Sequence, residues 1–258
     1  MRLSDHLNDL DDRIRRAGTV WVGCDFDGTL APLVDDPWEA AIDPLAAASV
    51  ARLAACPTAA VAIISGRALS DIRPRMGLSG VAYAGNHGAE IDAPGLKLTD
   101  AMAGEAAVAL GTAHHRLAES PLPLIQGVVI DHKTYSLSVD YRAVPPDERG
   151  PVIAAVAAAA AGLPTLHVLH GLHGSEVRAN GARNKGSAAL QLIRHQSGPE
   201  AVPIFLGDDR TDEDAFAALP DGVTVCVGDH PTTARYRVSS PADVAVFLDW
   251  LAGLCERL

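Results

Sequence analysis

The sequence predicts a protein of the α/β class, in which a smaller α+β domain is inserted into a doubly wound parallel-sheet core. Two observations lead to this prediction. Short apolar runs of the kind that form buried strands alternate with helix-like stretches, and each run ends in polar sequence, most often with glycine. From about residue 96 to about residue 180 the pattern changes, and a helix-like stretch followed by two short strands occurs twice.

The core is expected to begin with a helix, because Leu3, Leu7, Leu10 and Ile14 recur at helical spacing. The strands of its sheet are expected at five apolar runs, residues 19–24, 59–64, 81–84, 202–206 and 223–227. Helices are expected between them at residues 44–55 and 185–195. In Rossmann-like sheets of this kind the ligand crevice lies beyond the carboxyl ends of the strands, so we expect the polar residues there to converge.

The inserted domain is expected to contain a small antiparallel sheet and two helices. The helices are expected at residues 101–118 and 151–161, and the strands at 127–131, 134–141, 166–169 and 175–178. Proline and glycine at 93–95 and the polar stretch 180–183 indicate two linkers. We therefore expect the core at residues 1–95 and 182–258 and an α+β cap at residues 96–181, because an insert on two linkers can close over the strand ends.

Composition and charge exclude several classes of protein. Hydrophobic residues make up 48% of the 258 residues, which argues against a disordered chain. Lys and Arg number 21 and Asp and Glu number 32, a net charge of −11, so a basic nucleic-acid-binding surface is not expected. No run has the composition of a signal peptide or of a membrane span, and the four cysteines are scattered. We expect a cytoplasmic protein with no nucleic-acid or membrane partner.

The segment Asp25-Phe26-Asp27-Gly28-Thr29 carries two carboxylates at the end of an expected strand, followed by a glycine turn. One carboxylate at such a position can attack phosphorus, and the second can donate and accept a proton. Gly28 allows a tight turn that directs backbone N–H groups toward phosphoryl oxygens. A single short motif of this kind also occurs as a simple acidic turn, so it does not decide the function alone.

A second acidic segment, GDDRTDED, comes directly after the strand expected at 202–206 and carries five acids in seven residues. These carboxylates repel one another unless a cation lies among them. Mg²⁺ takes oxygen ligands and commonly binds one or two carboxylates together with a substrate phosphate. Asp208 is expected to be a ligand because it lies at the strand end, and Asp212 to assist it or to orient a ligand. Asp214 is expected to favour the N-terminus of the next helix.

Two further residues are candidates for binding an anion. Lys185 begins an expected helix and could reach the crevice, where its charge would neutralise a carboxylate or a phosphoryl oxygen. Ser65 follows the second strand, where a hydroxyl and the N–H groups of the next helix form an anion site. Taken alone, a lysine is more often solvated at the surface, and a serine more often caps a helix.

In order and spacing, these four motifs resemble those of the haloacid-dehalogenase-like phosphatases. The residues of these motifs are most similar to those of the trehalose-6-phosphate phosphatase family within that superfamily. The resemblance runs from about residue 21 to about residue 229. The segments that carry it are DFDGTLAPLVDDP at 25–37, SGR at 65–67, GNHGAE at 85–90, NKG at 184–186 and GDDRTDEDAF at 207–216.

The resemblance implies a role for each matching residue in the core. Asp25 would be the nucleophile and Asp27 the general acid and base. Asp25, the backbone carbonyl of Asp27 and Asp208 would hold Mg²⁺. Ser65 and Lys185 would bind the phosphoryl group.

The resemblance also implies which residues contact the sugar. The Glu-x-Lys motif of the family cap is represented here by Asp131-His132-Lys133, with aspartate in place of glutamate. Lys133, Arg142 and Glu176 would contact the sugar from the cap. A second group, Arg67, Asn86 and His87, would line the core side of the pocket.

The function implied by the resemblance is Mg²⁺-dependent hydrolysis of trehalose 6-phosphate to trehalose and phosphate, by a monomeric enzyme acting on a small sugar phosphate. Three alternatives remain open. The first is a related phosphatase for sucrose phosphate or a glycosyl phosphoglycerate. The second is a sugar phosphomutase, and the third is a phospho-accepting module like a response-regulator receiver, which uses a similar set of carboxylates and a lysine.

Overall fold

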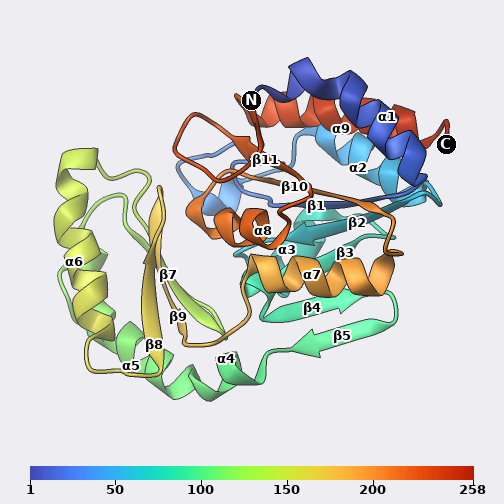
Figure 1. The fold of residues 1–258 in the computed structure, drawn as a ribbon. Coiled ribbons are helices and arrows are strands. Elements are labelled where there is room, and N and C mark those ends of the chain that lie inside the picture. Colours follow the sequence, from blue (N-terminus) through green and yellow to red (C-terminus); the bar gives the residue numbers. More distant parts are fainter. The chain divides into compact units, whose positions relative to one another are not determined.

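The computed structural model describes the backbone of residues 1–258 and every side chain except that of residue 103. Its contacts divide the chain into two compact units. The core unit comprises Met1–Leu98 and Asn184–Leu258, and the inserted unit comprises Thr99–Arg183. Figure 1 shows the two units joined by two connections, as expected for a segment inserted into one chain.

The core unit is built on an eight-stranded sheet in the order β12-β11-β10-β1-β2-β3-β4-β5. The strands from β12 to β3 run parallel, and β4 runs antiparallel to β3. Their bounds are β1 (Val20–Cys24), β2 (Ala59–Ile64), β3 (Ala82–Gly85), β4 (Glu90–Ala93), β5 (Leu96–Thr99), β10 (Val202–Gly207), β11 (Val223–Val227) and β12 (Tyr236–Val238). The strand order reverses direction beside β1, which is the arrangement of a doubly wound sheet.

Helices cover both faces of this sheet (Figure 1). One hydrophobic cluster joins the sheet to α1, α2, α3 and α9, and a second joins its other face to α7 and α8. The bounds are α1 (Leu7–Ala17), α2 (Pro44–Ala55), α3 (Leu69–Met76), α7 (Lys185–Gln196), α8 (Glu213–Ala218) and α9 (Pro241–Cys255). A short 3-10 turn, Leu3–His6, precedes α1.

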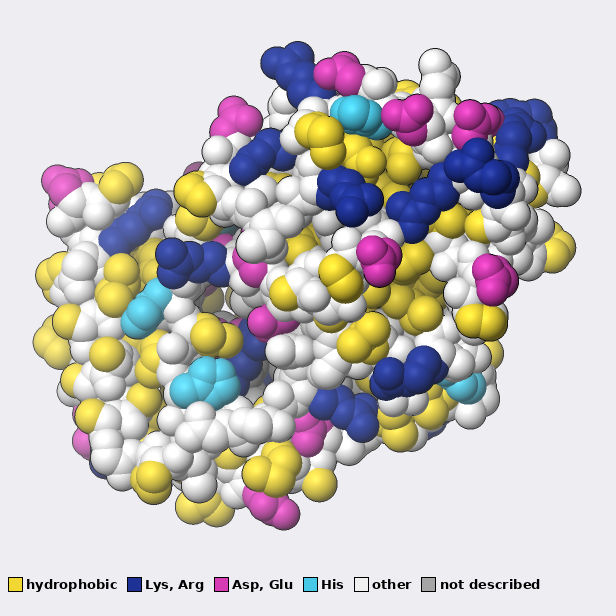
Figure 2. All heavy atoms as spheres, in the orientation of Figure 1, with side chains coloured by type: hydrophobic (Ala, Val, Ile, Leu, Met, Phe, Trp, Pro, Cys, Tyr) yellow, Lys and Arg dark blue, Asp and Glu magenta, His cyan; other side chains and the backbone are white. Residues whose placement is uncertain are grey.

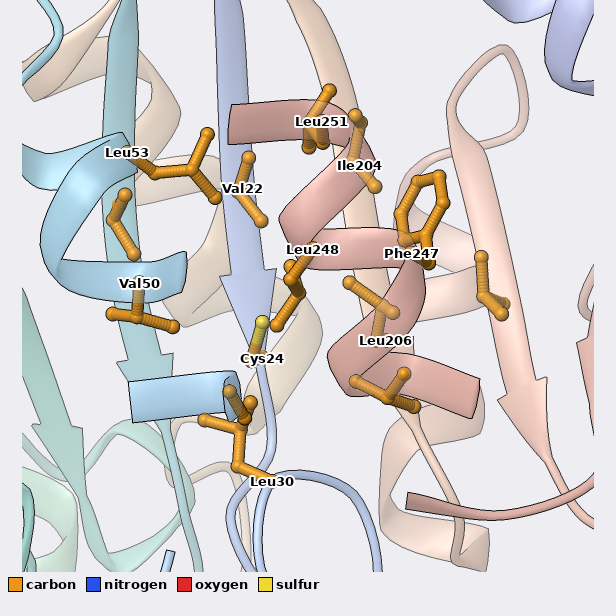
Figure 3. Close-up of a cluster of buried hydrophobic side chains, with 14 of the residues drawn as sticks. Val22, Cys24, Leu30, Val50, Leu53, Ile204, Leu206, Phe247, Leu248 and Leu251 are labelled. Carbon is orange, nitrogen blue, oxygen red and sulfur yellow. The ribbon is translucent and has the colours of Figure 1, made fainter. Parts of the chain in front are cut away.

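The central strands are buried on both faces, and their side chains alternate between the two clusters. Val22 and Cys24 of β1 belong to the first cluster and Trp21 to the second. Figure 3 shows Val22 and Cys24 among side chains of α2 and α9, including Val50 and Leu248. Each fully buried side chain of this size stabilises the fold by about 1.5–3 kcal/mol relative to an exposed one. This core holds the strand ends in fixed positions.

The fold class predicted from the sequence is confirmed, and so are the five core strands and the helices at α2 and α7, within one or two residues. The hairpin of β4 and β5 was not predicted. Ala93, Pro94 and Gly95 were interpreted as a linker, but Ala93 is the last residue of β4, and Pro94 and Gly95 form the turn between the two strands. Proline and glycine occur in hairpin turns as well as in linkers, so their presence did not separate the two cases.

The inserted unit contains a four-stranded antiparallel sheet in the order β6-β7-β9-β8. Leu137, Val139 and Val177 of one sheet face pack in a separate hydrophobic cluster with the helices α5 and α6. The bounds are α4 (Ala101–Glu105), α5 (Ala107–Ala118), β6 (Val129–His132), β7 (Ser136–Asp140), α6 (Arg149–Ala160), β8 (Leu166–His170) and β9 (Gly174–Ala179).

The single helix predicted at 101–118 is wrong, because the chain forms two helices there. Ala106 separates them, with φ −81° and ψ −2°, outside the range of a continuing helix. Asp100 starts α4 by accepting a hydrogen bond from the backbone N–H of Met102. Gly104 lies in the last turn of α4, where glycine weakens helical propensity.

Charged side chains of both signs occur on the face shown in Figure 2, with dark blue and magenta groups interspersed. Among the residues that the structure describes, no helix has both the length and the apolar composition of a membrane span. The four cysteines are buried free thiols.

Candidate active site

Polar residues follow four neighbouring strands of the core sheet and meet at one edge. Asp208 follows β10, Asp25 follows β1, Ser65 follows β2 and Asn86 follows β3. Because these strands are parallel and adjacent, their carboxyl ends lie together, although the residues are up to 183 positions apart (208 − 25). The structure thus brings together the groups that the sequence predicted to converge.

A buried lysine joins two of the carboxylates. The Nζ of Lys185 lies 2.9 Å from Oδ2 of Asp25 and 2.7 Å from Oδ1 of Asp212. The side chain of Lys185 is only 1% exposed, so the surface-lysine alternative is wrong. Asn184 places this lysine by capping α7, since its side chain accepts a hydrogen bond from the backbone N–H of Ser187.

Burial dominates the ionisation of this cluster. It raises the pKa of Asp25 to about 8, although Lys185 opposes the rise. It also raises the pKa of Asp208, and the neighbouring charges of Asp25 and Asp212 raise it further. For Lys185, burial favours a lower pKa, but Asp212 and Asp25 outweigh it and the pKa is raised. Three buried carboxylates therefore surround one permanent cation, and an additional cation would favour their ionised forms.

Asp208 is held beside Gly28 and Thr29. The hydroxyl of Thr29 donates a hydrogen bond to Oδ1 of Asp208 at 3.2 Å. A Cβ atom at position 28 would lie 2.0 Å from Oδ2 of Asp208, and Gly28 has a φ of +75°. Glycine is therefore required there by both the backbone conformation and the carboxylate.

The donor set at this strand edge fits a hard divalent cation such as Mg²⁺. Asp25, Asp208 and Asp212 each offer an oxygen atom within 4.8 Å of the others, and all three are buried. The oxygens of Asp212 already bind other groups, because Oδ1 accepts from Lys185 and Oδ2 from the backbone N–H groups of Asp208 and Asp209. Asp25 and Asp208 are thus the side chains best suited as ligands, and Asp212 orients Asp208.

The loop that contains Ser65 packs against the loop that contains His87. The backbone N–H of His87 donates to the carbonyl of Ser65 at 2.9 Å, and that of Asn86 donates to the carbonyl of Arg67 at 2.8 Å. A Cβ atom at position 66 would lie 2.6 Å from the His87 ring, so Gly66 permits this close approach. The hydroxyl of Ser65 lies four residues before the start of α3 at Leu69 and accepts a hydrogen bond from the backbone N–H of Arg67.

Asn86 and His87 have left-handed backbone conformations, with φ of +48° and +57°. This conformation is uncommon for residues other than glycine, and residues that adopt it cluster at functional sites. The side chain of Asn86 donates to Oε2 of Glu90 at 2.6 Å, which fixes the amide. Its Oδ1 atom is buried without a hydrogen-bond partner among the described residues, so it remains available to a donor from a ligand.

Arg67 makes contacts that differ from the predicted sugar contact. Its guanidinium binds both carboxylate oxygens of Asp27 at 2.7 Å, and Oδ2 of Asp71 at 2.7 Å. Asp27 is thereby connected to α3 and not to the buried lysine. The sequence indicated neither this pairing nor the part played by Asp71, although Asp71 lies four residues after Arg67, a spacing that favours ion pairs in helices.

Within the inserted unit, two of the predicted sugar contacts meet at Ser138 of the sheet, Glu176 from β9 and Lys133 from the turn after β6. The Nζ of Lys133 donates to Oγ of Ser138 at 3.0 Å, and this hydroxyl donates to Oε1 of Glu176 at 3.4 Å. Glu176 also pairs with Arg178 at 2.5 Å. Arg142, the third predicted contact, forms an ion pair with Asp140 at 2.6 Å.

Comparison with known proteins gives a family match. The family model described as trehalose-phosphatase matches residues 24–242. The trehalose-phosphate phosphatase of Mycobacterium marinum is 40% identical over 272 aligned positions, which cover 98% of this chain and 68% of that protein. The chain spans 60% of the length of similar proteins with the same name from Mycobacterium tuberculosis and Mycobacterium bovis.

Solved structures share the fold at lower identity. The C-terminal domain of the Candida albicans trehalose-6-phosphate phosphatase has a TM-score of 0.85 at 23% identity, with 95% of this chain and 96% of that domain covered. A sugar phosphatase of haloacid-dehalogenase (HAD) subclass IIB has a TM-score of 0.58 at 15% identity, with coverage of 92% and 100%. The core therefore has the HAD-like fold.

Proposed function

This chain belongs to the trehalose-phosphatase family, and we propose that it hydrolyses trehalose 6-phosphate to trehalose and phosphate. The observation that carries the proposal is the buried cluster of Asp25, Lys185 and Asp208 at the strand ends of a family member. A carboxylate held beside an ammonium group and a candidate cation site is suited to attack a phosphate ester, whose negative charge otherwise repels a nucleophile.

Asp25 acts as the nucleophile in this proposal. One of its carboxylate oxygens forms a bond to phosphorus while the bond between phosphorus and the sugar oxygen breaks. Asp27 donates a proton to the leaving sugar oxygen. Asp27 then accepts a proton from water as the water oxygen bonds to phosphorus, which releases phosphate and restores the carboxylate of Asp25.

Lys185 and Ser65 would bind the phosphoryl oxygens. Lys185 is already oriented by Asp212, so its charge is fixed before the substrate arrives. Asp25, Asp208 and the backbone carbonyl of Asp27 would hold Mg²⁺. The bound ion would offset the negative charge of the phosphate and keep Asp25 ionised, since burial otherwise raises its pKa to about 8.

We propose that the inserted unit contributes sugar recognition. Glu176 lies on a polar sheet face and Lys133 reaches that face from the turn after β6. Joined through Ser138, they offer an acceptor and a donor for hydroxyl groups. Arg142, Asn86 and His87 remain candidates for further contacts. All of these groups belong to one chain, so a monomer is sufficient for the proposed reaction.

Phosphate release from purified full-length protein tests the proposal. Trehalose 6-phosphate, glucose 6-phosphate and sucrose 6-phosphate are compared with Mg²⁺ and with EDTA. We expect release from trehalose 6-phosphate to be fastest, to stop in EDTA and to return with excess Mg²⁺. A preference for sucrose 6-phosphate would assign the chain to a related sugar phosphatase, and a rearranged sugar phosphate without free phosphate would make it a mutase. Full activity in EDTA would contradict the metal assignment.

A further inference from the structure

We propose that Arg67 and Asp71 form an anchor that positions the carboxyl group of Asp27 for proton transfer to the leaving sugar oxygen. This inference rests on the proposed phosphatase function. It assigns Arg67 a different part from the predicted sugar contact, and it gives a part to Asp71, which no sequence motif singled out. Both are positioning residues, because they act on the reaction through Asp27.

The first contact of the anchor is a two-point ion pair. Nε of Arg67 donates to Oδ2 of Asp27 and Nη2 donates to Oδ1, both at 2.7 Å. Two parallel N–H···O bonds fix both the position and the plane of a carboxylate, which a single bond does not. The Arg67 side chain is only 9% exposed, so the pair is shielded from water far more than a surface ion pair.

The second contact holds Arg67 itself. Nη1 of Arg67 donates to Oδ2 of Asp71, whose other oxygen accepts from Nε of Arg75 at 2.6 Å. Arg75 in turn donates to the backbone carbonyls of Trp38 and Ala40. Burial favours a higher pKa for Asp71, but its hydrogen bonds to the two arginines outweigh this and lower the pKa. The charges therefore alternate from Asp27 to Arg75. α3 carries Asp71 and Arg75, and Arg67 lies two residues before its first residue.

The guanidinium of Arg67 has few donors left for a phosphoryl group. Described residues accept hydrogen bonds from four of its five N–H groups. Nε and Nη1 each donate one, and Nη2 donates two, one to Asp27 and one to the carbonyl of Pro37 at 2.6 Å. The guanidinium also lies 5.5 Å from the centroid of the Phe26 ring. These contacts surround the group, so its principal function is to hold Asp27 and not to bind substrate.

An anchor for the general acid has a consequence that depends on the leaving group. A sugar alkoxide is a poor leaving group and must be protonated as the bond to phosphorus breaks. An aryl oxide such as 4-nitrophenolate is stable as an anion and needs little protonation. Loss of the anchor should therefore slow sugar phosphates much more than aryl phosphates, whereas loss of a phosphate contact would slow both alike.

The test compares kcat/KM for trehalose 6-phosphate and 4-nitrophenyl phosphate, because this ratio includes the step in which the leaving group departs. Since general acid catalysis contributes about 10²–10⁴-fold, we expect Asp71→Asn to lower kcat/KM for the sugar phosphate by about 10- to 100-fold. For the sugar phosphate the loss should lie in kcat, whereas kcat/KM for the aryl phosphate should change about threefold or less. Arg67→Lys, which retains the charge without the two-point geometry, should show the same pattern.

Two further variants separate positioning from stability. Asp71→Glu retains the carboxylate and should restore part of the lost kcat. Asp92→Asn is the matched control, because Asp92 pairs with Arg73 of the same helix, and among the described contacts this pair does not reach Asp27. Its kinetics should match wild type. Equal losses of kcat/KM for both substrates in Asp71→Asn and Arg67→Lys, or losses for the sugar phosphate confined to KM, would overturn the anchor. Absence of phosphate release by the wild-type protein would instead overturn the proposed function.

Discussion

Asp25 is the residue on which the proposed chemistry depends, and its substitution gives a sharp prediction. Asp25→Asn replaces the nucleophilic carboxylate by a neutral amide and should lower phosphate release at least about 10³-fold, within the range known for catalytic nucleophiles. The fold should be retained, because asparagine has the same shape and can still accept a hydrogen bond from Lys185. Phosphate release from trehalose 6-phosphate with excess Mg²⁺ measures the activity.

The same variant should be more stable than wild type in EDTA. Asp25, Asp208 and Asp212 are three buried carboxylates around one lysine, so removing one charge reduces their mutual repulsion. We expect Tm to rise by about 2–6 °C, which corresponds to about 1–2 kcal/mol in a protein of this size. Asp229→Asn is the control, because Asp229 also follows a strand but is exposed. Turnover at the wild-type rate by Asp25→Asn would remove Asp25 from the nucleophile position.

Sequence motifs predicted which residues meet, but not which partner each one binds. Asp25, Asp208 and Lys185 could be selected because strand ends in a parallel sheet converge and because the motifs occur in a known order. For Arg67, the same reasoning placed the residue at the site and assigned it to the sugar. Its actual partner, Asp27, depends on side-chain geometry across two loops, which spacing along the chain does not specify.

At the scale of elements, the approach of α7 to α8 positions Lys185. A Cβ atom at position 186 would lie 2.2 Å from the backbone carbonyl oxygen of Asp214, so only glycine permits this approach. Gly186→Ala should force the two helices apart, reduce stability by about 1–3 kcal/mol and reduce activity with it. Unfolding in urea and phosphate release by the same preparations measure the two effects.

A second helical glycine in the core unit provides the control for this prediction. At position 253 of α9, a new Cβ atom would meet only the ends of two arginine side chains, at 3.3 and 3.8 Å. These flexible ends can move, so Gly253→Ala should stabilise the protein by about 0.4–1 kcal/mol through the unfolded chain. If Gly186→Ala were equally tolerated, close packing of the two helices would not be what places Lys185.

Elements were predictable where hydrophobic pattern alone decides them. The buried runs of β1, β2 and β11 have few alternative structures, and α2 has proline at its first position and a capping aspartate before it. The hairpin of β4 and β5 was missed because its strands are short and half-exposed and its turn has the composition of a linker. The break at Ala106 was missed because alanine favours helix, so the interruption follows from tertiary packing.

At the scale of the whole molecule, the two units contain different kinds of groups. The core unit contains the carboxylates and the lysine suited to phosphoryl transfer. The inserted unit has its own hydrophobic cluster and a sheet face with donors and acceptors suited to hydroxyl groups. The change in sequence pattern after residue 95 was enough to predict an inserted α+β segment. The contact between Lys133 and Ser138, in contrast, needed the strand register.

This division predicts that substitutions on the polar sheet face change substrate discrimination and leave phosphoryl transfer intact. Lys133→Ala and Glu176→Ala should each lower kcat/KM for trehalose 6-phosphate by about 10- to 100-fold, as expected for loss of a hydrogen bond to a charged group. The loss should lie in KM, because these groups bind the sugar equally before and during reaction. For 4-nitrophenyl phosphate, which has no sugar, the change should be about twofold or less.

Glu119→Ala is the control for the inserted unit, since Glu119 is an exposed acid that pairs only with the exposed His115 among the ion pairs of the described residues. Equal losses for the sugar and aryl phosphates in Lys133→Ala or Glu176→Ala would mean that the inserted unit supports the fold or the chemistry and does not recognise the sugar. The anchor variants and these variants should also differ from each other. Asp71→Asn acts on kcat through the leaving group, and Glu176→Ala acts on KM through the sugar, so a double variant should lose the product of the two factors.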